Sequence, residues 1–205
     1  MRVATHNLIK GHTRLPYTST AFDAWDMVTA ADKGDAASTV VCVYTNKTFA
    51  TSQFYSSTNP SGYSREHTWP KSLGFPDDGA CNAPYTDGHH LFAAEQATNA
   101  ARGNKQYGAC LSQCTQYPIV GGVDRNVAGR YTWETWLGKR GDVARAQFYM
   151  DVRYEGGAHD DPACGAEIDL RLTNDDTLIR GVQSNAAVAY HGMLNDLLQW
   201  HADGN

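Results

Sequence analysis

The residues of this chain that could carry out acid–base or metal chemistry gather between positions 65 and 104. Three short segments hold them, namely REHTWPKS (65–72), DGHHL (87–91) and NAARGN (99–104). Three of the eight histidines lie in this stretch. The concentration of these side chains predicts one site built from all three segments.

Together the segments supply the side chains that metal-assisted phosphodiester hydrolysis needs. Carboxylate and carboxamide oxygens are hard ligands that suit Mg²⁺ or Ca²⁺, and two protein ligands leave positions for water and a phosphate. A neutral histidine beside such an ion can accept a proton from water near neutral pH, and arginine binds phosphate with two parallel hydrogen bonds. A metal-dependent phosphodiesterase is therefore the chemistry that these residue types favour.

The spacing of the motif residues limits how they can share a site. Glu66 and His67 are consecutive, and consecutive side chains of a regular strand point to opposite faces. They can act together only at a strand end or a bulge, and Pro70 makes a strand end there plausible. The same constraint applies to His89 and His90, of which one is expected to reach the site.

Hydrophobic patterning predicts a mixed α+β chain, rich in helix and loop, with a few strands. We expect helices over 3–10, 20–34 with Thr20 as its cap, 93–102, 143–154 with Asp142 as its cap, and a last one over 190–201. We expect extended segments over 40–44, 64–72 and 89–92, and loops over 51–63, 73–86 and 103–130. No linker or repeat is visible, which predicts a single domain over residues 1–205.

Composition and charge exclude several classes of protein. A chain of 205 residues with 41% hydrophobic and 11% aromatic residues is not globally disordered, and it contains no apolar run of 18 residues that could span a membrane. The net charge is −5, with residues 154–205 alone carrying 2 basic and 9 acidic groups. Such a balance argues against passive, charge-driven binding of nucleic acid, but it is compatible with a locally basic cleft.

The five cysteines favour disulfides and an exported protein. Four of them, at positions 81, 110, 114 and 164, lie in loop-like sequence, whereas Cys42 lies in an apolar run and is the natural free thiol. Cys110 and Cys114 could close a short loop, which leaves Cys81 with Cys164. The first residues have no apolar core typical of a signal peptide, so a leader is expected to be absent from this sequence.

The three motifs in this order resemble the endonuclease I family of bacterial periplasmic and extracellular nucleases, which belongs to the His-Me finger, or ββα-metal, superfamily. The resemblance extends to HNLIKGHTRLPYTS near the start, to KRGDVARAQFYMDVRYEG from residue 139 and to LLQWH near the end. It implies a ββα-metal motif at about 64–104. It also implies a periplasmic or secreted enzyme that acts as a monomer away from membranes.

The resemblance also implies roles for individual residues. His67 is expected to be the general base, and Glu66 and Asn99 are expected to bind the metal, Mg²⁺ or alternatively Mn²⁺ or Ca²⁺. Arg102 is expected to assist catalysis. The residues expected to contact the substrate are Arg65, Asp87, His90, Arg102 and Asn104. The implied activity is cleavage of DNA, and of RNA, with little sequence preference and with 5′-phosphate ends.

The chain departs from the family pattern at three places. Gly88 stands where the family often has leucine, and Phe92-Ala93 stands where it often has Arg-Pro, which removes one candidate phosphate contact. Many relatives continue beyond the Trp-His of the last helix, so this chain is expected to be shortened at its C-terminus.

Two alternatives remain open from the residues. A zinc hydrolase could use Asp87, His89, His90 and His67, although adjacent histidines are awkward ligands for one ion and no H-x3-H pair is present. A non-enzymatic binding module held by disulfides would explain the tyrosines and loops, but not the ordered motifs.

Overall fold

The computed structural model of the chain describes residues 2–159, 161–181 and 183–204. The described helices are α1 (Arg2–Ile9), α2 (Ala24–Ala31), α3 (Gln96–Arg102), α4 (Leu137–Arg153), α5 (Asp176–Ile179) and α6 (Leu194–Asp203), with short 3-10 turns η1 (Ala83–Thr86) and η2 (Pro162–Cys164). The described strands are β1 (Thr39–Val41), β2 (Thr48–Ala50), β3 (Tyr63–His67), β4 (Leu91–Glu95), β5 (Gln106–Tyr107), β6 (Thr115–Pro118), β7 (Arg125–Ala128), β8 (Thr132–Glu134), β9 (Asp169–Leu172) and β10 (Val188–His191). This mixture confirms the predicted α+β class.

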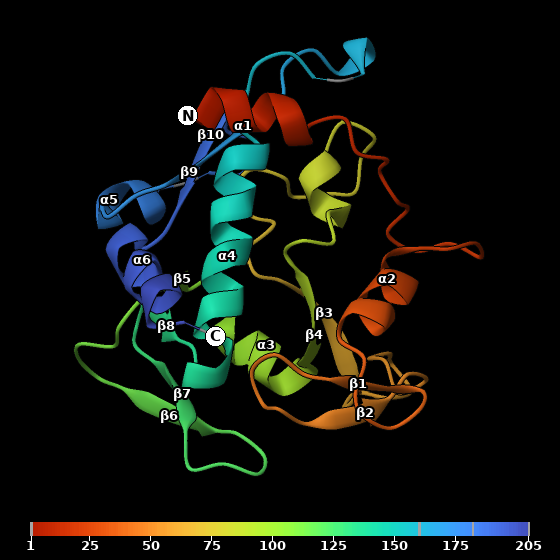
Figure 1. Ribbon diagram of the computed structural model, residues 1–205, viewed down its shortest axis with the longest axis vertical. Helices are drawn as coiled ribbons and strands as arrows, with labels where there is room; N and C mark the ends of the chain where they lie inside the picture. The colour runs from red at the N-terminus through yellow and green to blue at the C-terminus, as the bar shows by residue number, and fades with distance from the viewer. Residues whose placement is uncertain (1, 160, 182, 205) are drawn as a thin grey trace.

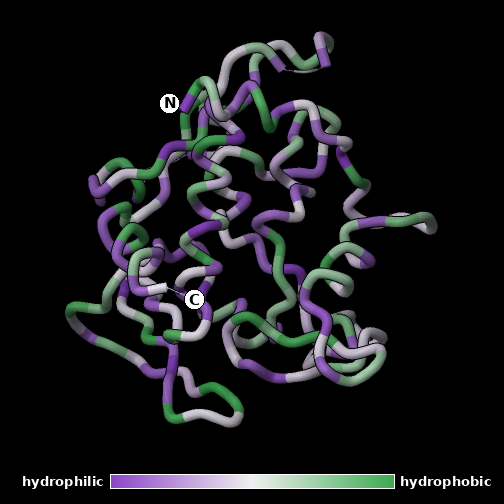
Figure 2. The backbone as a smooth tube through the Cα atoms, in the orientation of Figure 1, coloured by the Kyte–Doolittle hydropathy of each residue, from purple (hydrophilic) through white to green (hydrophobic). Residues whose placement is uncertain are grey.

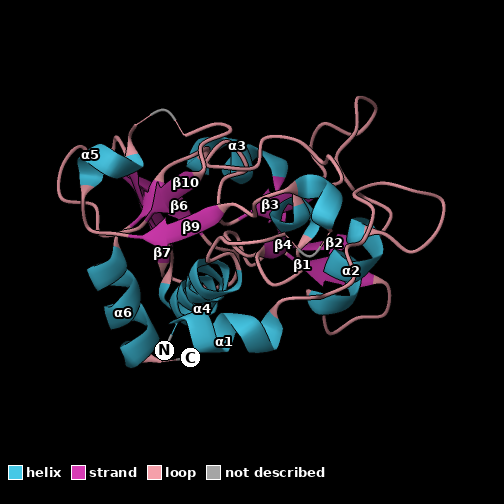
Figure 3. Ribbon diagram, turned by 90° about the horizontal axis from the view of Figure 1, so that it is seen from above, coloured by secondary structure: helices cyan, strands magenta, loops and turns pink. Residues whose placement is uncertain are grey.

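Helix α4 runs through the middle of the molecule (Figure 1). It packs against α1, α6 and β9, and the view from above shows α1, α4 and α6 along one side of the strands (Figure 3). Its Val143 belongs to a buried cluster with Trp133 and Leu197, whereas Met150 belongs to a second cluster with Trp69. Helix α4 therefore contributes buried apolar side chains to both clusters and connects them.

Hydrophobic and hydrophilic residues alternate over short distances along the chain (Figure 2). Over the described ranges, no helix has both the length and the apolar character required to cross a bilayer.

A strand pair followed directly by a helix carries the three sequence motifs. Strand β3 pairs antiparallel with β4, with Tyr63 opposite Glu95 and His67 opposite Leu91. Helix α3 begins at Gln96, immediately after β4, and contacts both strands. One face of the pair packs under α3, while Tyr63, Leu91 and other apolar side chains form a third core cluster with α2 and β1.

The sequence prediction was wrong about where strand gives way to helix near residue 93. Ala93 and Ala94 were expected to begin a helix, but their backbone pairs with Arg65 and Ser64 of β3, and both side chains are buried. Alanine favours helix only weakly against tertiary pairing. The predicted loop over 103–130 also contains β5, β6 and β7, which form a four-stranded sheet with β8 in the order β5-β8-β7-β6.

Other element ends also differ from prediction. Asp23, rather than Thr20, caps α2, where its side chain accepts hydrogen bonds from the backbone of Trp25 and Asp26. Helix α4 begins at Leu137, so Asp142 lies inside it, where it forms ion pairs with Lys139 and Arg145. Helix α6 begins at Leu194, and the upstream Tyr190 belongs to β10.

The predicted cysteine pairing is confirmed. Disulfides join Cys81 to Cys164 and Cys110 to Cys114, and Cys42 is a buried free thiol. Burial raises the pKa of the Cys42 thiol, which keeps it protonated and unreactive. The long-range disulfide ties the loop before η1 to the segment after α4.

The two disulfides should differ in their contribution to stability. Cys81–Cys164 closes a loop with a separation of 83 residues, and Cys110–Cys114 closes one with a separation of 4. By loop-closure entropy we expect loss of the first (Cys81→Ser with Cys164→Ser) to lower the free energy of unfolding by about 4.5 kcal/mol, and loss of the second by about 2 kcal/mol. Equilibrium urea unfolding measures both, and a larger loss for the short loop would contradict this account.

Candidate active site

His67 is the last residue of β3, as the predicted strand end requires. Its Nε2 lies 2.9 Å from the carbonyl oxygen of Tyr85. Because a carbonyl oxygen can only accept, Nε2 must carry the hydrogen, and the lone pair of the neutral ring is on Nδ1. Among the described residues, none forms a hydrogen bond with Nδ1, which leaves this atom available as a base.

An aromatic environment keeps the His67 ring in place. The rings of Tyr17, Tyr85, Phe75 and His90 surround it, with centroids 4.9–6.4 Å from its own. Burial, with a further contribution from His90, holds the pKa of His67 well below its usual value. The imidazole is therefore neutral, which is the form that can accept a proton.

Glu66 points away from these rings and into a buried polar cluster. Its Oε1 accepts hydrogen bonds from the Tyr44 hydroxyl (2.7 Å) and from Arg102 Nη1 (2.9 Å). The Tyr44 hydroxyl also lies 2.5 Å from that of Tyr107. Burial raises the pKa of Glu66, and the Arg102 guanidinium and Tyr44 hydroxyl oppose this because they stabilise the carboxylate. No described residue donates to the second oxygen, Oε2.

Asn99 lies over the same face of β3 as Glu66. Its Nδ2 donates to Ser64 Oγ (2.8 Å), two strand positions before Glu66, so Ser64 and Glu66 share a face. Asn99 and Arg102 are three residues apart on α3 and therefore share a face of that helix. The Ser64 contact orients the Asn99 amide, whose Oδ1 receives no hydrogen bond from any described residue.

These two oxygens suit a hard divalent ion. Glu66 Oε2 and Asn99 Oδ1 are a carboxylate and an amide oxygen, and both lack a protein donor within the described chain. Mg²⁺ is commonly held by one or two protein oxygens, with water and phosphate completing its octahedron. The residues present therefore fit such an ion, which Glu66 and Asn99 would hold.

Arg102 was expected to assist catalysis and to contact the substrate, but the structure buries it. The residue is 1% exposed. Its guanidinium donates to Glu66 and to the backbone carbonyl oxygens of His67 (2.9 Å) and Thr68 (2.6 Å), and it lies 3.5 Å from His191 Nε2. This position suits a residue that fixes the end of β3 and the direction of the Glu66 carboxylate.

Arg65 and Asn104, two further predicted substrate contacts, lie outside the Glu66–Arg102 cluster. Arg65 lies two strand positions before His67 and so on its side of β3, where Tyr17 contacts both. The Arg65 guanidinium stacks on Tyr17 (3.4 Å) and Trp25 (4.1 Å), and it donates to the Tyr17 carbonyl and to Thr18 Oγ1. Asn104 is exposed beyond the end of α3, where it lines a pocket.

Asp87 forms the centre of a second polar network. Its Oδ2 accepts hydrogen bonds from the hydroxyls of Tyr149 (3.0 Å) and Tyr154 (2.8 Å), and its Oδ1 accepts from His89 Nδ1 (2.9 Å). Burial alone would raise the pKa of Asp87, but the hydrogen bonds from His89 lower it overall. The ionised Asp87 in turn raises the pKa of His89, which stacks on Tyr149 at 4.0 Å.

The structure does not assemble the alternative zinc site. His90, predicted to contact substrate, is buried with Nε2 2.7 Å from the Pro84 carbonyl oxygen, and His67 is bonded to the Tyr85 carbonyl. His89 uses Nδ1 to bind Asp87. Within the described residues, no group of three or more His, Cys, Asp or Glu side chains is placed to hold a metal.

Sequence reasoning missed several residues that support the site. They are Tyr44, Ser64, Tyr85, Tyr107 and His191. Ser64 could have been found, since it precedes Glu66 by two positions and must share its face. The other four come from distant parts of the chain, and no local pattern indicates them.

Removing the Arg102 charge should destabilise the fold strongly. Arg102→Gln leaves the buried Glu66 carboxylate without its cation, so we expect the free energy of unfolding to fall by about 3–5 kcal/mol. The matched control is Arg125→Gln, an exposed arginine of β7, for which we expect about 0.5 kcal/mol or less. Urea unfolding measures both. Equal effects of the two variants would contradict the buried ion pair.

Two comparisons with known proteins identify what the chain is similar to. The sequence model of the Endonuclease I family matches residues 1–203. The extracellular ribonucleases of Bacillus amyloliquefaciens and of Bacillus subtilis (strain 168) are each 35% identical to this chain over 202 residues. The match covers 98% of this chain but only 60% of each relative. No solved structure matches the chain significantly. The family match over almost the whole length establishes that the chain belongs to the endonuclease I family.

Proposed function

We propose that this chain is a metal-dependent endonuclease that hydrolyses phosphodiester bonds of DNA and RNA. The observation that carries the proposal is the state of His67, a neutral imidazole held by the Tyr85 carbonyl so that Nδ1 keeps its lone pair. Family membership and the names of the two extracellular ribonucleases support the same substrate class.

In this mechanism His67 acts as the general base. Nδ1 accepts a proton from a water molecule as its oxygen attacks phosphorus on the side opposite the 3′ oxygen. The bond from phosphorus to the 3′ oxygen breaks, the departing oxygen takes a proton from solvent, and the other product carries a 5′-phosphate end. A positioned general base contributes about 10²–10⁴-fold in rate. The Tyr85 carbonyl stabilises the proton on Nε2, and the aromatic rings around His67 keep its ring plane fixed.

Glu66 and Asn99 would hold the divalent ion, for which we propose Mg²⁺. When bound, the ion would stabilise negative charge on the phosphate and on the departing oxygen. The side chains of Glu66 and His67 lie on opposite sides of β3. Because His67 is the last residue of the strand, a substrate bound at the strand end would reach both side chains. Arg102 and Tyr44 fix Glu66 Oε1 and leave Oε2 for the ion.

Secretion and low sequence preference belong to the same proposal. Two disulfides are typical of proteins that fold in an oxidising compartment, and both relatives are named extracellular. Contacts to phosphate and sugar carry no direct information on base identity, so a site that recognises the backbone would cleave many sequences.

The role of His67 as base can be tested by substitution. We expect His67→Ala to reduce the cleavage rate of plasmid DNA and of an RNA oligonucleotide by about 10²–10⁴-fold, because only the general base is lost. His201→Ala, in an exposed histidine of α6, is the matched control and should retain full activity. Cleavage by the His67 variant at a rate close to that of the unmodified protein would contradict the assignment.

The proposed ligands predict a separate effect on metal binding. We expect Glu66→Gln and Asn99→Ala each to weaken Mn²⁺ binding by at least tenfold in calorimetric titration, and chelation to abolish cleavage. Gln96→Ala, at the start of α3, is the control. His67→Ala should bind the ion normally, which separates ligand from base. Unchanged titrations for both ligand variants, or stoichiometric zinc in the purified protein, would overturn this site.

A further inference from the structure

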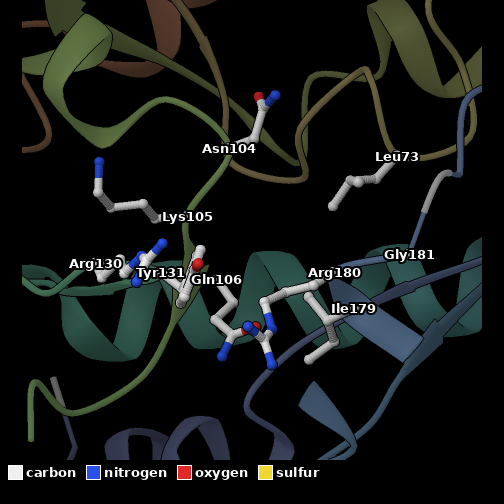
Figure 4. Close-up of a pocket in the computed structure, with 9 residues that line it drawn as sticks. All are labelled: Leu73, Asn104, Lys105, Gln106, Arg130, Tyr131, Ile179, Arg180 and Gly181. Carbon is white, nitrogen blue, oxygen red and sulfur yellow. The ribbon is translucent and has the colours of Figure 1, made fainter. Parts of the chain in front are cut away.

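A basic pocket lies beyond the C-terminal end of α3, outside the proposed catalytic cluster. Its volume is about 550 Å³. Figure 4 shows that four segments line it, namely Leu73, the loop after α3 with Asn104, the β7–β8 turn with Arg130 and Tyr131, and the end of α5 with Arg180. No residue of the catalytic cluster lines it, and the proposed function does not use it.

The charge of this pocket is opposite to that of the whole chain. Lys105, Arg130 and Arg180 line it, and of the described lining residues none is acidic. A neighbouring pocket shares Lys105 and Arg130, and its described lining also lacks acidic residues. In a chain with a net charge of −5, two adjoining pockets whose charged lining residues are all cations form a basic surface that would favour an anion. Asp176 lies beside the surface as the ion-pair partner of Arg180.

Tyr131 orients the two arginines. The guanidinium carbons of Arg130 and Arg180 lie 4.9 and 4.7 Å from its ring centroid. Such cation–π contacts limit the rotation of a long side chain, so less entropy is lost when its fork binds a ligand. A planar guanidinium matches two oxygens of a phosphate group and binds them with parallel hydrogen bonds.

The pocket lies close to the proposed metal ligands, because Asn104, Lys105 and Gln106 follow α3 directly. Lys105 Nζ donates to the Ala101 carbonyl (2.6 Å) and so stays against the end of α3. Gln106 is buried, with its amide nitrogen donating to Asp176 Oδ1 (3.0 Å). Asn104 follows Asn99 by five residues. The three steps to Arg102 are helical at about 1.5 Å each and the last two span at most about 7 Å, so the pocket begins on the order of 10 Å from that ligand.

We infer that this pocket is a secondary phosphate subsite, which binds the backbone of a single nucleic-acid strand a few nucleotides from the bond that is cleaved. The inference rests on the proposed nuclease function and adds a binding site to it. A nucleic-acid strand carries phosphates at regular intervals, whereas a mononucleotide could not reach both places. The subsite should therefore strengthen binding of long substrates and leave the chemical step unchanged.

Steady-state kinetics on substrates of two lengths tests the inference. With a single-stranded 12-nucleotide substrate we expect Arg130→Gln and Arg180→Gln each to raise KM by about tenfold with unchanged kcat. Cleavage of a dinucleotide should be unaffected. Binding of the labelled 12-mer in the His67→Ala background should lose about 0.7 of its log–log salt slope for each arginine removed. Arg125→Gln, which lies outside both pockets, is the matched control.

The outcomes separate this inference from the proposed function. If both arginine variants cleave the 12-mer with the KM of the unmodified protein, or if the dinucleotide is affected equally, the subsite is overturned. If the unmodified protein binds the 12-mer through these arginines but cleaves neither substrate, the subsite stands and the nuclease proposal fails. Circular dichroism and thermal unfolding establish that both variants are folded.

Discussion

The buried ion pair between Glu66 and Arg102 is the constraint on which the rest of the site depends. It joins β3 to α3, and the same guanidinium also binds two carbonyl oxygens at the end of β3 and approaches His191 near the C-terminus. Burying two charges is costly unless their hydrogen bonds are satisfied. The Tyr44 hydroxyl adds one of those bonds, so distant parts of the chain fix one carboxylate.

This arrangement prepares the site before any substrate arrives. Among the described residues, hydrogen bonds reach one oxygen of Glu66 and the nitrogen of the Asn99 amide, so the other oxygen of each residue could bind the proposed ion. The Tyr85 carbonyl does the same for His67 by selecting its tautomer. Catalytic groups held by such secondary contacts need little rearrangement during the reaction. Stability of the β3–α3 unit and readiness of the site therefore have the same physical origin.

The sequence predicted the class of the fold better than the ends of its helices and strands. The resemblance of three short motifs to a known family implied roles for Glu66, His67 and Asn99, and these roles stay predictions. The strand end required at His67 was confirmed. The start of α3 was misplaced because Ala93 and Ala94 suit a helix locally, while pairing with β3 decides their conformation. The burial of Arg102 depends on residues far apart in sequence, which no local pattern reveals.

The charge of a segment likewise does not predict the charge of the surface to which its residues contribute. Residues 154–205 are strongly acidic as a segment, yet Arg180 from that segment completes a basic pocket with Lys105 and Arg130.

The ion site proposed at Glu66 and Asn99 is tested most directly by anomalous diffraction from a crystal containing Mn²⁺. We expect an ion within bonding distance of both Glu66 Oε2 and Asn99 Oδ1, at the end of β3 where His67 lies. An ion bound at Asp87 and His89, with none at Glu66, would contradict it.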